Sequence, residues 1–291
     1  MTPSPSAWPF GALGLPPASI LAVPGRGEFF LRDSGGDGHP VLLLHGWMFS
    51  GDLNWALSYE PLAAAGYRVL SIDHRGHGRG LRSRKPFRLS DCADDCAAIL
   101  RETGAVGATA VGYSMGGAIS QLLAHKHPAS VSSLVMCATS AQFSSPQMKR
   151  IWRAMPALRI ALGIGGVATY ERALGQMGFP KNPRSEWVAA ELSRGSSRDI
   201  AEAGKELGRH DASKLLASIK HPSASVITSR DKSISPTFQQ HLADGLRATV
   251  FEVEADHMAS ATHPHEFNTA LLAALADVRS RTVTPKRKAA K

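Results

Sequence analysis

Short apolar runs recur along the first half of the chain at a spacing typical of buried strands. Val41 to Leu44 is continuously apolar, as expected of a strand covered on both faces, and Tyr67 to Ile72 and Ala108 to Val111 repeat the pattern. Helical patterns lie between these runs, at Glu60 to Ala65 and at Ser90 to Glu102, where Ser90 is a candidate N-cap. This alternation predicts an α/β fold with a mostly parallel central sheet and helices on both faces.

The pattern changes between residues 141 and 208. Strand-like runs disappear there, and apolar residues such as Met148, Trp152 and Met155 follow helical spacing. Strand patterns return at Ala224 to Thr228 and Ala248 to Val253, and a last helix is predicted from Phe267 to Val278. We therefore predict a core formed by residues 26–140 and 209–278, interrupted by a helical cap at 141–208.

The two ends of the chain differ from this core in composition. Residues 1–25 are rich in Pro, Gly and Ser and are interpreted as a leader, while residues 279–291 are interpreted as a basic, mobile tail. The tail holds six basic and no acidic residues, and without them the net charge falls from +9 to +3. The charge is therefore local, and we expect no nucleic-acid partner, although weak contact of the tail with an anionic surface stays open.

The cysteines and the N-terminal segment carry no sign of secretion. Cys92, Cys96 and Cys137 are too few for a disulfide scaffold, and no nearby His or Cys completes a metal-ligand spacing. Prolines interrupt the apolar stretch from Trp8 to Val23, so we expect neither a signal peptide nor a membrane span there. The expectation is a cytoplasmic protein with structural thiols, no metal and no cofactor.

The most specific motif is Gly112-Tyr113-Ser114-Met115-Gly116. It follows a β-branched run and precedes an apolar helical pattern that extends from Ala118 to His125. A serine at the apex of a strand–turn–helix unit has an exposed hydroxyl and sits at a helix N-terminus, which favours developing negative charge. Ser114 is therefore the candidate nucleophile.

A serine nucleophile needs a base within hydrogen-bond reach, and the base needs an orienting acid. On this type of fold the chain order is Ser, acid, His. Asp231 follows a late strand and His257 follows the next one, so both side chains are expected at the carboxyl edge of the sheet, together with Ser114. The alternatives are Asp211 and Asp244 for the acid, and His263 and His265 for the base.

These segments resemble the α/β-hydrolase superfamily, in the serine hydrolase branch with a helical cap. The resemblance spans residues 41 to about 275. The segments that carry it are His45-Gly46-Trp47, Asp73-His74-Arg75-Gly76-His77-Gly78, Gly112 to Gly117, Ser229-Arg230-Asp231 through Pro236, and Asp256-His257-Met258.

The resemblance implies roles for individual residues. Ser114 would be the nucleophile, His257 the general base and Asp231 the acid that orients it, and the backbone N–H groups of Trp47 and Met115 would form the oxyanion hole. Asp73 is interpreted as a structural anchor of its loop and His45 as a support of the oxyanion loop.

The sequence departs from the family pattern at two positions, where Asp256 and Thr228 replace the usual glycines. Asp256 directly precedes His257, where a carboxylate would raise the pKa of the imidazole or compete for its proton. Thr228 lies three residues before Asp231. Both departures leave the detailed geometry of their loops open.

The expected function is cofactor-free hydrolysis of a carboxylic ester or related acyl compound through an acyl-enzyme on Ser114. The substrate is expected to be a small molecule with an apolar moiety, because the cap is apolar. An acyltransferase or a C–C bond hydrolase with the same triad is the first alternative. A non-catalytic ligand-binding protein on this fold is the second.

Overall fold

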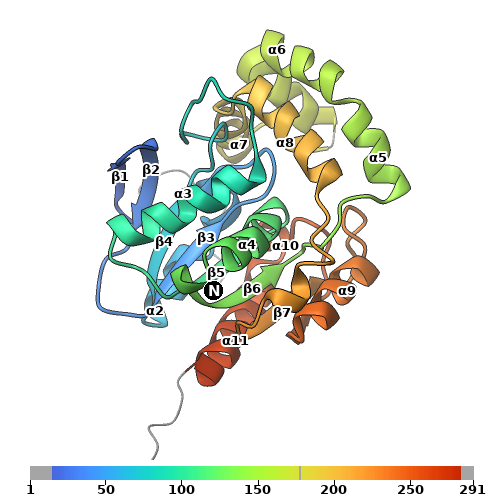
Figure 1. The fold of residues 1–291 in the computed structure, drawn as a ribbon. Helices are drawn as coiled ribbons and strands as arrows, with labels where there is room; N and C mark the ends of the chain where they lie inside the picture. Colours follow the sequence, from blue (N-terminus) through green and yellow to red (C-terminus); the bar gives the residue numbers. More distant parts are fainter. Residues whose placement is uncertain (1–14, 177, 283–291) are drawn as a thin grey trace, which may run out of the picture.

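The computed structural model describes residues 15–176 and 178–282 of the chain and places an eight-stranded sheet at its centre (Figure 1). The strand order is β1-β2-β4-β3-β5-β6-β7-β8, with antiparallel pairing at β1–β2 and β2–β4 and parallel pairing from β4 to β8. The predicted fold class is confirmed. The strands are β1 (Ala18–Val23), β2 (Gly27–Asp33), β3 (Pro40–Leu44), β4 (Arg68–Ile72), β5 (Ala108–Tyr113), β6 (Val131–Cys137), β7 (Ser223–Thr228) and β8 (Thr249–Val253).

Helices cover both faces of the sheet, which explains why the central strands are apolar at every position. In β3, Leu42 and Leu44 join one buried cluster, which includes α3, α4 and α9, while Val41 and Leu43 join the other, which includes α1, α2 and α11. These helices are α1 (Gly51–Trp55), α2 (Tyr59–Ala64), α3 (Leu89–Glu102), α4 (Met115–Lys126), α9 (Pro236–Leu246) and α11 (Pro264–Thr282); α10 (Ala259–Thr262) and two short 3₁₀ turns (Pro128–Ser130 and Leu216–Ser218) complete the core.

The N-terminal region contains a strand in a segment that the sequence analysis assigned to the leader. Residues 1–14 of the predicted leader lie outside the described residues, but Ala18–Val23 forms β1 and pairs with β2 along its whole length. Five of its six residues are apolar, yet four of the six side chains are exposed, because β1 is an edge strand and not the buried strand that an apolar run predicts. Its backbone pairing with β2, to which a short turn connects it, holds it in place.

Two expectations about helix ends need correction. Ser90 does not cap α3, because the helix begins at Leu89 and the N-cap position is Arg88, which makes no capping hydrogen bond through its side chain. At the C-terminus, Arg279 and Arg281 of the predicted tail belong to the last turn of α11. Residues 283–291 lie outside the described part of the chain.

Four helices between β6 and β7 form the cap, which lies at one end of the molecule with α6 outermost (Figure 1). They are α5 (Pro146–Arg153), α6 (Met155–Gln176), α7 (Pro183–Ser193) and α8 (Ser197–Arg209). Gly166 interrupts α6 with φ 50° and ψ −148°, a conformation that glycine adopts readily. Within the described ranges no single helix is long and apolar enough to cross a membrane, whereas α5 and α6 together pass that test of length and composition with a bend of 53° between them.

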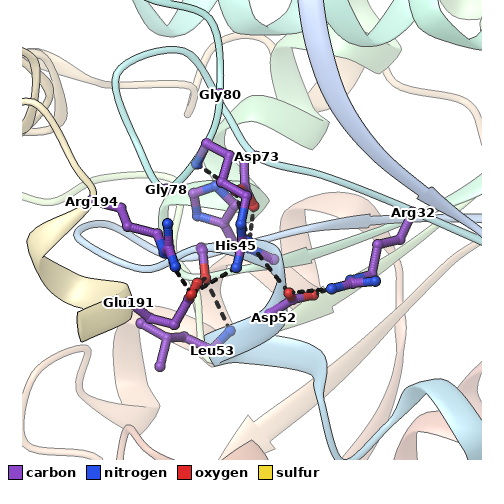
Figure 2. A network of polar contacts seen from close by, with 12 residues as sticks. Arg32, His45, Asp52, Leu53, Asp73, Gly78, Gly80, Glu191 and Arg194 are labelled. Carbon is purple, nitrogen blue, oxygen red and sulfur yellow. Dashed lines mark hydrogen bonds and ion pairs between the residues drawn. The ribbon is translucent and has the colours of Figure 1, made fainter. Parts of the chain in front are cut away.

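A buried polar network fastens the cap to the core (Figure 2). Glu191 of α7 is 2% exposed and pairs with Arg79 of the loop after β4, at 2.6 Å between Oε1 and Nη2. Its other oxygen accepts a hydrogen bond from the Ser50 hydroxyl, at 3.1 Å. Asp52 extends the network to Arg32 of β2, with an Nη2–Oδ2 distance of 2.8 Å. The cap is thus held at α7 by charges that the core shields from water.

Candidate active site

Ser114 occupies the turn between β5 and α4, and the turn is strained. Its φ is 51° and its ψ −113°, a backbone conformation that side chains other than glycine rarely adopt. The turn is possible because two neighbours lack side chains: a Cβ on Gly112 would lie 2.4 Å from the carbonyl oxygen of Gly116, and a Cβ on Gly116 would lie 2.0 Å from that of Leu44. The glycines therefore let the helix start close to the sheet and leave the Ser114 hydroxyl at the edge of β5.

The structure brings Ser114, His257 and Asp231 together. The Ser114 Oγ lies 3.1 Å from His257 Nε2, and His257 Nδ1 lies 2.7 Å from Asp231 Oδ2. A carboxylate only accepts hydrogen bonds, so Nδ1 carries the proton and Nε2 is the acceptor for the serine hydroxyl. The three side chains come from loops after β5, β7 and β8, which end at the same edge of the sheet.

The alternative residues have other partners. Asp211 accepts a hydrogen bond from the backbone N–H of Ser213, and Asp244 accepts one from Gln240 one turn earlier in α9. His263 bonds to the Thr262 hydroxyl, and His265 lies in the first turn of α11. Asp231 and His257 are the pair that the structure joins to Ser114.

The backbone N–H groups of Trp47 and Met115 are the candidate donors of an oxyanion hole. In the described part of the chain, neither N–H donates to a protein acceptor, and Met115 is the first residue of α4, where the helix dipole is positive. The segment that contains Trp47 lies against Ser114, because a Cβ on Gly46 would be 3.5 Å from the Ser114 Cβ. Both N–H groups therefore stay available for a ligand oxygen.

His45 supports this loop from inside. Its Nε2 accepts the backbone N–H of His74 at 2.9 Å, and its Nδ1 lies 2.8 Å from the Gly46 carbonyl oxygen, to which it donates. Burial lowers the pKa of His45 to about 4, so the ring is neutral at pH 7 and suited to this pair of bonds.

Asp73 has the geometry expected of a loop anchor. Its two oxygens accept the backbone N–H groups of Gly51 and Arg79, each at 2.7 Å, and the residue is 1% exposed. It ties the segment after β3 to the segment after β4.

The acid is held by residues that the sequence analysis missed or misjudged. Asp231 Oδ1 accepts the N–H groups of Ser233 and Ile234, at 2.7 and 2.9 Å. Asp231 Oδ2, which also receives His257, accepts the Thr228 hydroxyl at 3.0 Å and Gln239 Nε2 at 3.2 Å. Thr228, which replaces the usual glycine, thus contributes a donor to the acid.

Gln239 had one signal in the sequence, since it is a polar residue on the apolar face of α9. It is 1% exposed, and its amide also bonds to Thr228 Oγ1 and to the Ile234 carbonyl oxygen. The other departure from the family pattern, Asp256, accepts the Met258 N–H at 2.8 Å and so has a backbone partner in its own turn.

A cavity of about 190 Å³ opens at Ser114 and His257. Gly46, Trp47 and Asn54 line it on the core side, and the cap contributes apolar walls. Trp152 is central among these, because its ring meets that of Trp47 edge-on at 5.3 Å and its Nε1 donates to the Phe143 carbonyl oxygen. The other apolar side chains that line the cavity come from both cap and core: Phe49, Phe143, Met148, Ile151, Leu207, Ile234 and Met258.

None of the three cysteines lines this cavity, and all three are buried. Cys92 and Cys96 belong to α3 and Cys137 ends β6; all three are free thiols, and burial raises their pKa. Across the described residues, no three side chains of His, Cys, Asp or Glu gather as metal ligands would.

The fold and the site define a class of protein. Residues 39–159 match the family model described as the alpha/beta hydrolase fold. The chain belongs to the α/β-hydrolase superfamily and is an enzyme of that class, and the insertion between β6 and β7 gives it a helical cap.

Known relatives agree with this assignment. The 3-oxoadipate enol-lactonase 2 of Acinetobacter baylyi is 27% identical over 72% of this chain and 79% of its own length. The dihydrolipoyllysine-residue acetyltransferase component of the acetoin cleaving system of Pseudomonas putida is 28% identical over 87% of this chain and 68% of its own. Among solved structures, an esterase from Exiguobacterium antarcticum has a TM-score of 0.75 at 19% identity, covering 88% of this chain and 98% of that one, a likeness in fold.

Proposed function

We propose that the protein is a serine hydrolase that cleaves a carboxylic ester or a related acyl compound. The observation that carries this proposal is the continuous path from the Ser114 hydroxyl through the His257 ring to Asp231, with distances of 3.1 and 2.7 Å. Each distance is within reach of a proton transfer or a stabilising hydrogen bond. Relatives named as an enol-lactonase and an esterase support acyl chemistry for this site.

In the proposed reaction Ser114 Oγ attacks the carbonyl carbon while His257 Nε2 takes the hydroxyl proton. Asp231 stabilises the imidazolium that forms. The carbonyl oxygen becomes negative and receives the N–H groups of Trp47 and Met115. The imidazolium then gives its proton to the leaving alcohol, the acyl-enzyme forms, and a water that loses its proton to His257 releases the acid.

The cavity supports a short, apolar acyl group. Its volume of about 190 Å³ is below the range of about 300–1,000 Å³ that is typical of sites for drug-sized ligands. Its cap-side wall is made of side chains such as Met148 and Trp152, which offer contact area and few polar partners. A charged acyl chain would have to give up its hydration in this cavity without compensation.

A fluorophosphonate probe tests the nucleophile directly. We expect the wild-type protein to be labelled and the Ser114→Ala variant to be unlabelled, with Ser120→Ala, a buried serine of α4, as the matched control that keeps its label. Persistent labelling of Ser114→Ala contradicts the assignment. A wild-type protein that stays unlabelled but binds a small apolar ligand supports the ligand-binding alternative.

Esters of graded acyl length test the substrate class. We expect kcat/KM to be highest for short acyl chains and to fall as the chain outgrows the cavity. The same assay with an added alcohol separates hydrolysis from acyl transfer, since an acyltransferase forms the new ester at the expense of the free acid.

A further inference from the structure

The outer surface of the cap carries a group of exposed apolar side chains on one helix, α6. Ile160 and Ile164 of α6 are 63% and 82% exposed, and Val167 is 39% exposed. The uncharged segment from Ile160 to Thr169 contains all three. Isolated exposed apolar residues are common on proteins, but a contiguous group on one element marks a surface that meets something other than water.

The apolar residues of α6 form a stripe that faces away from the protein. Ala157, Ile160, Ala161 and Ile164 follow the i, i+3, i+4, i+7 spacing of one helix face, and all four are exposed. The opposite face of α6 packs on the rest of the cap, and Leu162 in the middle of the helix takes part in this packing. Met155 lies against Gly204 of α8, and Tyr170 and Leu174 pack with Ala189 of α7. The middle of α6 is therefore held on the outside of the cap (Figure 1).

Exposed basic side chains lie on α6 and on the preceding helix α5. Helices α5 and α6 contain five basic residues and one acidic residue, Glu171. The five are exposed, and none forms an ion pair within the parts of the chain that the structure describes; they are Lys149, Arg150, Arg153, Arg159 and Arg172. Lys149, Arg150 and Arg153 also share a face of α5 by their spacing of three and four residues.

We infer that this face of α5 and α6 docks on an anionic phospholipid surface. A helix with exposed apolar side chains and flanking Lys and Arg residues lies in the interface of a bilayer, with its apolar face at the acyl boundary and its cations at the headgroups. The positive charge of this face favours anionic lipid over a second copy of the chain. A two-fold dimer would place the same basic surface against itself, which costs repulsion, whereas anionic lipid neutralises it.

Vesicle co-sedimentation of the full-length protein tests this inference. We expect binding to phosphatidylcholine vesicles that contain 30% phosphatidylglycerol, little binding to pure phosphatidylcholine, and weaker binding at high salt. The double variant Ile160→Ser/Ile164→Ser should bind the anionic vesicles about tenfold more weakly. Ile20→Ser is the matched control, because Ile20 is 61% exposed on β1 and should leave binding unchanged.

A charge variant gives a second arm. Lys149→Glu/Arg153→Glu should weaken binding to the anionic vesicles, while Lys214→Glu, an exposed lysine outside the cap, should not. All these positions lie outside the cavity, so hydrolysis of a water-soluble ester by each variant reports that the enzyme is folded.

Three results would overturn the inference. The first is a wild-type protein that binds neither kind of vesicle. The second is binding that the Ile160→Ser/Ile164→Ser variant retains in full, which would assign it to another surface. The third is a concentration-dependent dimer that this variant abolishes while vesicles bind nothing, which would make α6 a contact between copies. The binding assay needs no turnover, so its outcome is independent of the proposed hydrolase activity.

Discussion

Glu191 of the cap and Arg79 of the core form an ion pair of 2.6 Å although 111 residues separate them in the chain. The Glu191 side chain is almost completely buried and also bonds to Ser50 and Arg194 (Figure 2). Arg79 in turn approaches Asp52 at 3.3 Å. The cap is therefore joined to the core by a network in which each charge has an opposite partner, as burial requires.

Removal of the Glu191 carboxylate should loosen the cap. We expect Glu191→Gln to lower the free energy of unfolding by about 2 kcal/mol, since Arg79 loses its closest partner but keeps Asp52 and some contact with water. Urea denaturation measures the change. The control Arg194→Gln removes a half-exposed partner of the same carboxylate and should cost less than about 1 kcal/mol. Equal effects of the two variants would show that the buried ion pair contributes no more to the free energy of unfolding than the half-exposed one.

Gln239 should affect catalysis through the orientation of Asp231. In Gln239→Leu the carboxylate loses one neutral donor and Thr228 loses its amide partner, so we expect kcat to fall about three- to tenfold with a smaller change in KM. Steady-state kinetics with a short-chain ester measure both constants. Gln240→Leu is the matched control, because Gln240 is the exposed neighbour and bonds only to Asp244 among the hydrogen bonds described. Unchanged kcat in Gln239→Leu would contradict the positioning role.

Three buried histidines should make the fold sensitive to mild acid. His45 lies 4.4 Å from His74 and 5.5 Å from His77 between ring centroids, and burial lowers the pKa of His45 to about 4 and of His77 to about 3. In the unfolded chain these three histidines take up protons as the pH falls below about 6.5, whereas in the folded chain they stay neutral. Stability is therefore present above pH 6.5 and is lost as the pH falls toward the folded pKa values.

Urea denaturation at pH 7 and pH 5 measures this loss. Each such histidine contributes up to about 2 kcal/mol to the difference in the free energy of unfolding between pH 7 and pH 5. We expect His77→Asn to reduce the difference by about that amount and His241→Asn, at an exposed position of α9, to leave it unchanged. An unaltered difference in His77→Asn would contradict a neutral buried ring.

Two glycines should respond to alanine in opposite directions. A Cβ on Gly116 would lie 2.0 Å from the Leu44 carbonyl oxygen, so Gly116→Ala should destabilise the core by at least about 3 kcal/mol. A Cβ on Gly175 of α6 would meet nothing within 4 Å, so Gly175→Ala should raise the free energy of unfolding by up to about 1 kcal/mol. Thermal unfolding measures the stability of both variants. A Gly116→Ala variant as stable as the wild type would contradict the close approach of α4 to β3.

Much of the fold could be predicted because local patterns report burial. The apolar runs of β3, β4 and β5 and the return of strands at β7 and β8 are present where the hydrophobic pattern indicates them. The strand β1 was missed although its sequence is apolar, because it lies within a segment rich in Pro, Gly and Ser that was interpreted as a leader, and its pairing with β2 shows only in the structure. Gly163, Gly165 and Gly166 interrupt the helical pattern of the cap in the sequence, and the structure places the break in α6 at Gly166, since glycine permits a kink without requiring one.

For the site, the sequence by itself determined the chemical groups: a serine in a glycine-framed turn, and an acid and a histidine that each follow a late strand. Only the tertiary structure decided the distances between them, the hydrogen bonds that Thr228 and Gln239 donate to Asp231, the size of the cavity and the outward apolar face of α6. The physical reason is that residue type and spacing specify local conformation and burial. Contacts between residues of different strands, helices and loops depend instead on how sheet, helices and cap pack together.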